Sequence, residues 1–277
     1  MKALVIDISK CNGCHNCQIA CKDEHVGNDW TPYAKPQPII GQFWTKVIDV
    51  TRGTVPKVKV NYIHSICQHC DEAPCIPACP QKAIYKREDG IVIIHPEKCA
   101  GSRNCIDACP YQVIYFNRDL NISQKCTFCA HLLDKGWKEP RCVDVCPTGA
   151  LTFAEEDELR DLIKKAEVLH PEFKVKPRVY YIGLPKRFIA GALYDSKKDE
   201  CIEGAKITIR DNETGEKVVT VSDDFGDFWA ENLKVGTFSL LIEKDGYRTK
   251  EMLSIRTEKD VNLGDIELRN RDETPVD

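Results

Sequence analysis

The chain has 277 residues and a net charge of −4, with no basic excess that would indicate nucleic-acid binding. No apolar stretch approaches the roughly 18 residues that a transmembrane helix needs, so we expect no direct membrane insertion. Fifteen of the sixteen cysteines fall between Cys11 and Cys146, whereas Cys201 stands alone and is expected to be a structural residue near a turn. Composition therefore divides the chain into a cysteine-dense part and a cysteine-poor part.

The cysteine-dense part repeats one local pattern. Cys79, Cys109 and Cys146 are each followed by a proline and then by a β-prone run, and short apolar strands lead into the cysteine groups at residues 3–8 and 91–94. Proline cannot donate a backbone hydrogen bond, so it ends the short helical turn, and a strand leads away. The pattern predicts two ferredoxin-like lobes over residues 1–154.

Residues 22–66 interrupt these repeats as an insertion. The segment carries Trp30, Tyr33, Phe43 and Trp44 among several prolines. Two interpretations stay open: a loop packed on its own lobe, or a docking surface, because exposed aromatic rings favour interfaces.

The rest of the chain predicts a helix, a connector and a sheet-rich domain. Residues 155–169 are expected to form a helix with Leu159, Leu162 and Ile163 on one face, inside a helix-and-connector region 155–187. From 188 to 268, apolar and polar residues alternate between turn signals, which predicts a small antiparallel β-sandwich of the immunoglobulin or transthyretin type. A charged tail, 269–277, follows. The fold class is α+β, and nothing in the sandwich indicates catalysis.

The cysteines form four groups with regular spacing. They are Cys11-x2-Cys14-x2-Cys17-x3-Cys21, Cys67-x2-Cys70-x4-Cys75-x3-Cys79, Cys99-x5-Cys105-x3-Cys109 and Cys126-x2-Cys129-x12-Cys142-x3-Cys146. A cubane iron–sulfur cluster needs one thiolate at each of four irons. Three closely spaced cysteines supply three of them, and the fourth cysteine of the group points at the other cluster of the lobe.

This crosswise rule predicts four ligand sets. The first set is Cys11, Cys14, Cys17 and Cys146. The second set is Cys126, Cys129, Cys142 and Cys21. The third set is Cys67, Cys70, Cys75 and Cys109. The fourth set is Cys99, Cys105 and Cys79, with Ser102 at the remaining corner. We therefore expect three 4Fe–4S clusters and a fourth cluster of less certain type.

Ser102 stands where a regular group would carry a cysteine. Its hydroxyl oxygen ligates a fourth iron, or the corner is empty and the cluster is 3Fe–4S, or the site holds no cluster. The last outcome is disfavoured because three thiolates remain. Oxygen ligation is expected to lower the reduction potential, whereas loss of an iron often raises it, so either outcome tunes this cluster differently from its neighbours.

Other interpretations of the cysteines are weaker. A disulfide scaffold would suit a secreted protein, but the apolar run before Asp7 is too short for a signal peptide. Zinc uses Cys-x2-Cys pairs too, but not usually tight runs of four followed by proline.

Several polar residues near the cysteines have smaller roles. His15 and His69 are expected to face solvent or to lie behind the ligands. Charges that precede ligands either tune the clusters or are simply solvated; these are Lys98, Lys125 and Arg141.

With Lys125-Cys126-Thr127-Phe128-Cys129-Ala130-His131, the cysteine groups resemble those of the iron–sulfur subunits of molybdopterin oxidoreductases of the dimethyl-sulfoxide-reductase superfamily. A narrower resemblance, to the small subunits of pyrogallol–phloroglucinol transhydroxylases and related phenol hydroxylases and dehydroxylases, is carried by Lys176-Pro177-Arg178-Val179-Tyr180-Tyr181, Glu203-Gly204-Ala205-Lys206 and Phe225-Gly226-Asp227-Phe228. The resemblance implies a β-sandwich after the ferredoxin part, and a large partner that carries molybdenum on two pterin guanine dinucleotides and acts on hydroxylated aromatic rings.

This sequence departs from the transhydroxylase small subunits in its third cysteine group. In the transhydroxylase small subunits the third cysteine group is degenerate and three clusters remain, whereas here Cys99, Cys105 and Cys109 persist. This indicates net electron exchange with an external carrier. A stand-alone polyferredoxin and a zinc-binding interaction module are the alternatives. The cytoplasm is the expected compartment, with periplasmic co-export on a partner's signal as the alternative.

Overall fold

The computed structural model describes residues 1–271, and the rest of the expected tail, 272–277, lies outside them. The chain divides into two compact units. The first comprises residues 1–50 and 62–184, and the second comprises residues 51–61 and the chain from 185 onward. Among the described residues, every helix is too short or too polar to span a bilayer.

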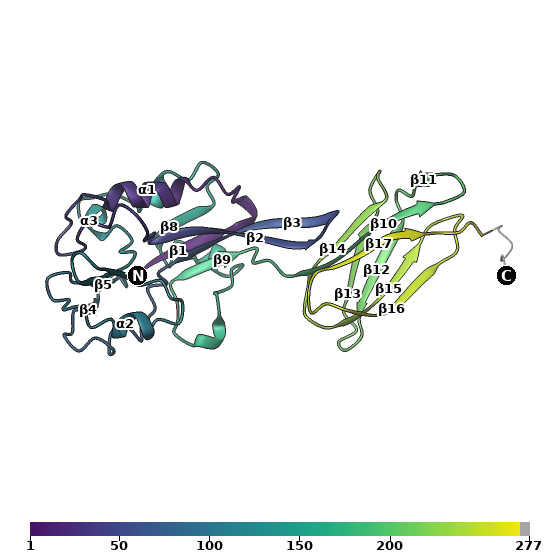
Figure 1. The fold of residues 1–277 in the computed structure, drawn as a ribbon. Helices are drawn as coiled ribbons and strands as arrows, with labels where there is room; N and C mark the ends of the chain where they lie inside the picture. Colours follow the sequence, from purple (N-terminus) through teal and green to yellow (C-terminus); the bar gives the residue numbers. More distant parts are fainter. Residues whose placement is uncertain (272–277) are drawn as a thin grey trace. The chain divides into compact units, whose positions relative to one another are not determined.

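Apart from α1 and the hairpin β2–β3, the first unit is built from short elements joined by loops (Figure 1). Its strands, including the hairpin β2–β3 whose tip counts with the second unit, are β1 (Lys2–Asp7), β2 (Thr45–Thr54), β3 (Lys57–Ile66), β4 (Ile84–Lys86), β5 (Val92–Ile94), β6 (Tyr115–Asn117), β7 (Ile122–Gln124), β8 (Leu151–Glu155) and β9 (Val179–Ile182). Its helices are α1 (Asn16–His25), α2 (Asn104–Asp107), α3 (Ala130–Leu133), α4 (Arg141–Asp144) and α5 (Arg160–Ile163), with 3-10 turns at Ile8–Lys10 and Pro171–Phe173.

A three-stranded sheet organises the first unit, in the order β8-β1-β9. Strand β1 pairs antiparallel with β8 and parallel with β9. Leu4 and Ile6 pack into the main core of the unit, and Ala3 and Val5 pack on the opposite face. A strand buried on both faces needs a continuous apolar run, which explains the sequence of this segment.

Two small hairpins confirm the strands expected after the Cys-Pro repeats. Strand β4 pairs with β5, and β6 pairs with β7, both antiparallel. Each hairpin begins a few residues after a Cys-Pro pair, so a paired strand follows each of these cysteines in the chain.

The expected helix over 155–169 is wrong in extent. Glu155 pairs with Lys2 as the end of β8, and Glu167 bridges to Tyr181, so both ends are drawn into sheet pairing and only α5 is helical. Tertiary pairing here outweighs the helical pattern. The apolar face is confirmed, since Leu159 packs against Ala3 and Val5.

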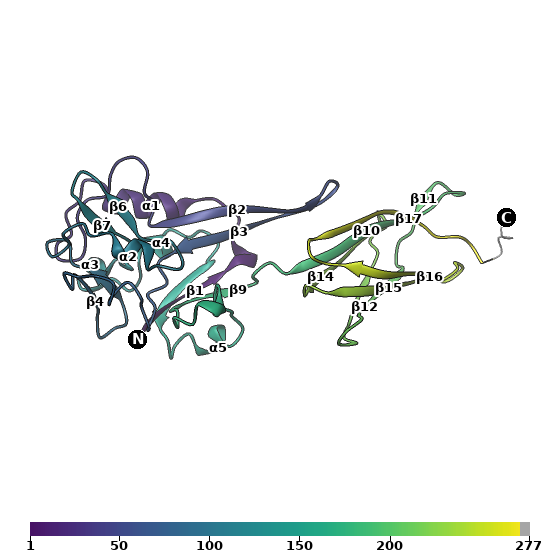
Figure 2. The same cartoon turned by 60° about the horizontal axis from the view of Figure 1, so that its bottom comes forward.

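The second unit is a two-layered β-sandwich (Figure 2). Its strands are β10 (Arg187–Asp195), β11 (Glu200–Cys201), β12 (Lys206–Asp211), β13 (Lys217–Val221), β14 (Asp227–Leu233), β15 (Thr237–Glu243), β16 (Lys250–Arg256) and β17 (Val261–Glu267). One sheet has the order β13-β12-β15-β16, and the other is β11-β10-β14 with β17 beside β10. Ile207, Ile209, Phe238, Leu240 and Ile242 all lie in the core, which confirms the alternation.

The sandwich departs from the antiparallel expectation at one pair. Strand β17 runs parallel to β10, from Ile189 opposite Val261 to Tyr194 opposite Glu267. The preceding strand, β16, belongs to the other sheet, so the chain crosses between layers before β17 and is free to align with β10 in the same direction.

The hairpin tip at residues 51–61 is tied to the sandwich within the second unit. The Arg52 guanidinium donates two hydrogen bonds to the Asp260 carboxylate, each at 3.1 Å. Both side chains are almost fully buried. Lys57 also pairs with Asp227.

Candidate iron–sulfur cluster sites

The cysteines of the first unit are shielded from water. Ten are buried, four are half-buried, and Cys14 alone is exposed. All sixteen cysteines of the chain lie within the described residues as free thiols, so the disulfide alternative is wrong. Cys201 is exposed on β11.

Cysteines from distant stretches meet in the first two sets. Burial, followed by repulsion from Cys11 and Cys146, raises the pKa of the Cys17 thiol to about 12. Burial and repulsion from Cys126 and Cys129 raise the pKa of Cys21 well above its usual value. The structure thus brings the last cysteine of each of these groups to the cysteines of the other group.

The third set surrounds a cavity. Cys67, Cys70, Cys75 and Cys109 all line it, together with apolar side chains such as Val92. Burial and repulsion from Cys67 and Cys109 raise the pKa of Cys70 to about 12. The cavity is thus lined by three thiols of one group and the last thiol of another.

The fourth set is assembled in the same way. Burial raises the pKa of Cys105, and Cys99 and Cys79 add repulsion. Cys79 comes from the second group, so this meeting is also crosswise.

The chemistry of these sets suits a polynuclear iron centre. Buried thiols resist deprotonation because their thiolates would lose solvation and repel one another, and cationic iron offsets that cost by binding the thiolates. Among residues 1–271, no three His, Cys, Asp or Glu side chains are arranged to hold one metal ion. The thiols lie instead around spaces such as the cavity of the third set. The residues present therefore fit iron–sulfur clusters.

The three Cys-Pro repeats share one backbone geometry. Lys82, Gln112 and Gly149 each follow the cysteine by three residues, and all have positive φ. This turn lets a backbone N–H return to the sulfur, as where Ala83 N donates to Cys79 Sγ at 3.3 Å. Such N–H donors stabilise thiolate charge and tune a cluster.

Ser102 occupies the same backbone position as Cys14. Each is preceded by a glycine with φ near 72°, each is followed by a left-handed residue, and a helix then begins. A side chain at Gly101 would meet the Asn121 backbone oxygen at 2.7 Å, so this loop requires glycine. Both Ser102 and Cys14 are exposed.

The two histidines inside the cysteine loops differ in their exposure to solvent. His15 is partly exposed and lies 3.7 Å from Asp49. His69 is fully buried and does not face solvent, because its Nδ1 accepts a hydrogen bond from Val92 N at 3.0 Å and its ring stacks on Phe128.

The charged residues that precede ligands differ as well. Lys125 is buried and donates to the Cys126 carbonyl at 3.0 Å, so it is not solvated. Arg141 pairs with Asp144 and Glu24. Lys98 is exposed.

The aromatic residues of the insertion pack on their own unit. Trp44 is buried against His25, and Trp30 stacks on His131 with ring centroids 4.3 Å apart. These contacts favour the packed-loop interpretation for Trp30 and Trp44.

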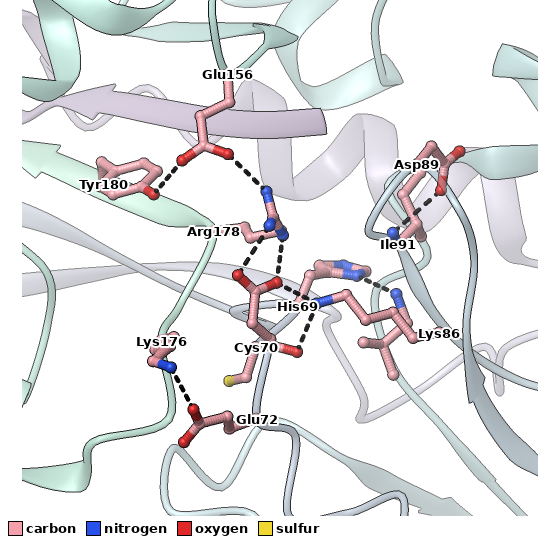
Figure 3. Close-up of polar contacts among 12 residues, drawn as sticks. His69, Cys70, Glu72, Lys86, Asp89, Ile91, Glu156, Lys176, Arg178 and Tyr180 are labelled. Atoms are coloured by element: carbon pink, nitrogen blue, oxygen red, sulfur yellow. Dashed lines mark hydrogen bonds and ion pairs between the residues drawn. The ribbon is translucent and has the colours of Figure 1, made fainter. Parts of the chain in front are cut away.

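A salt-bridge cluster fastens the Cys67–Cys70 loop (Figure 3). Arg178 donates to both oxygens of Asp71, at 2.6 and 2.8 Å, and to Glu156 at 3.0 Å. Burial alone would raise the pKa of Asp71, but hydrogen bonds from Lys86 and Arg178 lower it. The backbones are also joined, since Arg178 N donates to Gln68 O at 2.9 Å.

Two sulfur contacts come from residues that the cysteine spacing does not indicate. His64 Nε2 lies 3.6 Å from Cys11 Sγ, and Ser123 N donates to Cys99 Sγ at 3.4 Å. Burial, followed by the nearby charge of His15, lowers the pKa of His64 to about 4. Neither residue lies in a cysteine group, so only the three-dimensional arrangement reveals them.

Buried thiols from different cysteine groups that come together crosswise define the class: an iron–sulfur electron-transfer protein. A family model described as a 4Fe-4S dicluster domain matches residues 58–156, and one described as a carboxypeptidase regulatory-like domain matches residues 189–269. The second match agrees with the sandwich.

Similarity to known proteins indicates the family within this class. The pyrogallol hydroxytransferase small subunit of Pelobacter acidigallici is 38% identical, over 96% of this chain and 98% of that protein. The arsenate respiratory reductase iron–sulfur subunit of Shewanella sp. is 33% identical over 65% of this chain, and a tetrathionate reductase subunit of Salmonella typhimurium is 34% identical over 68%. Those alignments cover 94% and 74% of the two relatives.

The chain belongs to the iron–sulfur subunits of molybdopterin oxidoreductases of the dimethyl-sulfoxide-reductase superfamily. It is an electron-transfer subunit that relays single electrons through iron–sulfur clusters for a catalytic partner subunit.

Proposed function

We propose that the catalytic partner is a large subunit that carries molybdenum on two pterins and acts on a hydroxylated aromatic compound. Support comes from the similarity to the pyrogallol hydroxytransferase small subunit, which extends over nearly the whole length of both chains and includes the sandwich. The clusters supply one-electron redox chemistry when bound. The protein supplies their spacing, their insulation from water and the groups that tune them.

The proposal assigns four clusters to the four ligand sets. Within each set, thiols of one group lie close enough to the last cysteine of another to repel it or to share a cavity with it. Three sets have four cysteines, and the fourth has three with Ser102. In this proposal, two cluster-bearing lobes precede the sandwich in the chain.

The sets form a row in this proposal. Repulsion between thiols links Cys142 of the second set to Cys17 of the first, and Cys126 of the second set to Cys67 of the third. The same interaction links Cys75 of the third set to Cys105 of the fourth. A row in which each set approaches the next is the arrangement that stepwise electron transfer needs.

We infer net electron exchange with an external carrier, and the retained cysteines of the fourth set are the observation that carries this inference. Cys79 and Cys99 lie close enough to Cys105 for their repulsion to raise its pKa, so the row does not stop at three sets. A complex that merely moves a hydroxyl group would not need the extra step.

The test is turnover by the purified complex with and without an added electron donor or acceptor. We expect turnover only when one is added. Sustained turnover with neither would contradict the inference.

We expect Ser102 to ligate iron through its hydroxyl oxygen, because its backbone position matches that of Cys14. Ser102→Cys should then leave the iron content unchanged and raise the reduction potential of one cluster, since sulfur replaces oxygen. Iron analysis and a redox titration followed by electron paramagnetic resonance would measure both. A gain of about one iron would show instead that the natural cluster is 3Fe–4S.

A further inference from the structure

A histidine outside every cysteine group lies against a cluster ligand. His64 is on β3, is 1% exposed, and has its Nε2 3.6 Å from Cys11 Sγ. Within the hydrogen-bonding range of sulfur, this is a direct contact between a ring nitrogen and a thiol of the first set.

The direction of the hydrogen bond follows from the chemistry of the ligand. Cys11 must be a thiolate to bind iron, and a thiolate only accepts hydrogen bonds. Nε2 must therefore carry the ring proton and donate it. The other ring nitrogen, Nδ1, is buried and has no partner among the described residues. No acceptor there therefore stabilises the tautomer that carries the proton on Nδ1.

The position of the ring is fixed by its backbone. The Tyr181 hydroxyl donates to the His64 carbonyl at 2.9 Å and accepts from Gln68 Nε2 at 3.1 Å. Tyr181 is fully buried on β9. Strand β3 is thus held in place behind Cys11, and a buried, anchored donor loses little entropy in making its hydrogen bond.

We propose that His64 is a positioning residue that donates a hydrogen bond from Nε2 to the Cys11 thiolate and so raises the reduction potential of the first-set cluster. This rests on the proposed ligand sets. Reduction adds negative charge that spreads onto the thiolates, so an N–H donor stabilises the reduced state more than the oxidised state. The low local dielectric strengthens this difference.

The test compares His64→Leu with the natural protein in an anaerobic redox titration followed by electron paramagnetic resonance. We expect one cluster to become harder to reduce, with the ratio of reduced to oxidised cluster at a fixed potential falling about tenfold. For a one-electron couple this is a shift of about 59 mV. His64→Gln keeps an N–H donor of similar reach and should restore part of the shift.

His15→Asn is the matched control. His15 lies in the cysteine group of Cys11, but its ring is partly exposed. Asparagine tolerates the left-handed backbone at this position. We expect no comparable shift. An unchanged potential in His64→Leu at full iron content would overturn the proposal.

Two further measurements keep the proposal testable. If His64→Leu lost iron, electron–nuclear double resonance on the natural protein should still detect an exchangeable proton coupled to the first-set cluster, and its absence would overturn the proposal. If Cys11→Ala left every cluster intact, the assignment of the ligand sets would fail instead, so the two failures are distinguishable.

Discussion

Replacing Cys21 with alanine should remove the cluster of the second set while leaving the first-set cluster in place. In sequence, Cys21 belongs to the group of Cys11, Cys14 and Cys17. In the structure it is fully shielded and is repelled by Cys126 and Cys129. Because each cubane iron needs its own thiolate, the loss should fall on the set that Cys21 completes.

The expected readouts of Cys21→Ala are quantitative. Iron and acid-labile sulfide should fall by about one cluster, and the magnetic resonance signal that disappears should be the one that Cys129→Ala also removes. Cys14, which is exposed, is assigned to the first set, so Cys14→Ala should affect a different signal.

The control for general thiol loss is Cys201→Ala. Cys201 is exposed on β11 of the second unit, and its replacement should leave the iron content unchanged. If Cys21→Ala and Cys14→Ala abolished the same signal, crosswise sharing would be wrong for this half of the protein. Cys129→Ala would then be expected to leave that signal in place.

The local structure around the cysteines could be predicted from the sequence because cluster chemistry constrains the spacing of the ligands directly. Each Cys-Pro repeat fixes a turn, a returning N–H and a strand within a few residues, as at Cys79 and Ala83. These are local features, and local features can be read from a sequence. The sandwich was predictable for a similar reason, since alternation identified the inward residues of β12 and β15.

The features that sequence could not supply are long-range. His64 reaches Cys11 across 53 positions, and Arg178 reaches Asp71 across 107. The helix expected over 155–169 failed for the same reason, because pairing with Lys2 and Tyr181 shortens it from both ends. The parallel pairing of β17 with β10 also depends on a crossing between layers that alternation does not encode.

Arg178 links this long-range organisation to the clusters, and its loss should release the loop that carries Cys67 and Cys70. The guanidinium is 3% exposed and bridges Asp71 and Glu156, which are about a third or more exposed. Arg178→Met keeps the apolar stem but leaves two carboxylates without their shared partner. We expect a loss of about 2 kcal/mol, less than for a fully buried ion pair, because both carboxylates keep part of their solvation and Asp71 keeps Lys86.

The measurement for Arg178 is the rate at which a chelator removes iron, because unfolding of a cluster protein is not reversible. A loss of about 2 kcal/mol corresponds to an increase of about thirtyfold in the population of the opened loop, and cluster loss should accelerate accordingly. Arg178→Lys keeps the charge but not the two-pronged geometry, so it should fall between Met and the natural residue.

Lys176→Ala is the matched control from the same connector. Lys176 pairs with Glu72, but both side chains are more than half exposed, so its removal should leave the rate of iron loss nearly unchanged. The two cations lie two residues apart and contact neighbouring acids of one loop, so charge alone does not distinguish them. If both variants lost iron at the same rate, burial of the Arg178 bridge would not be what holds the loop.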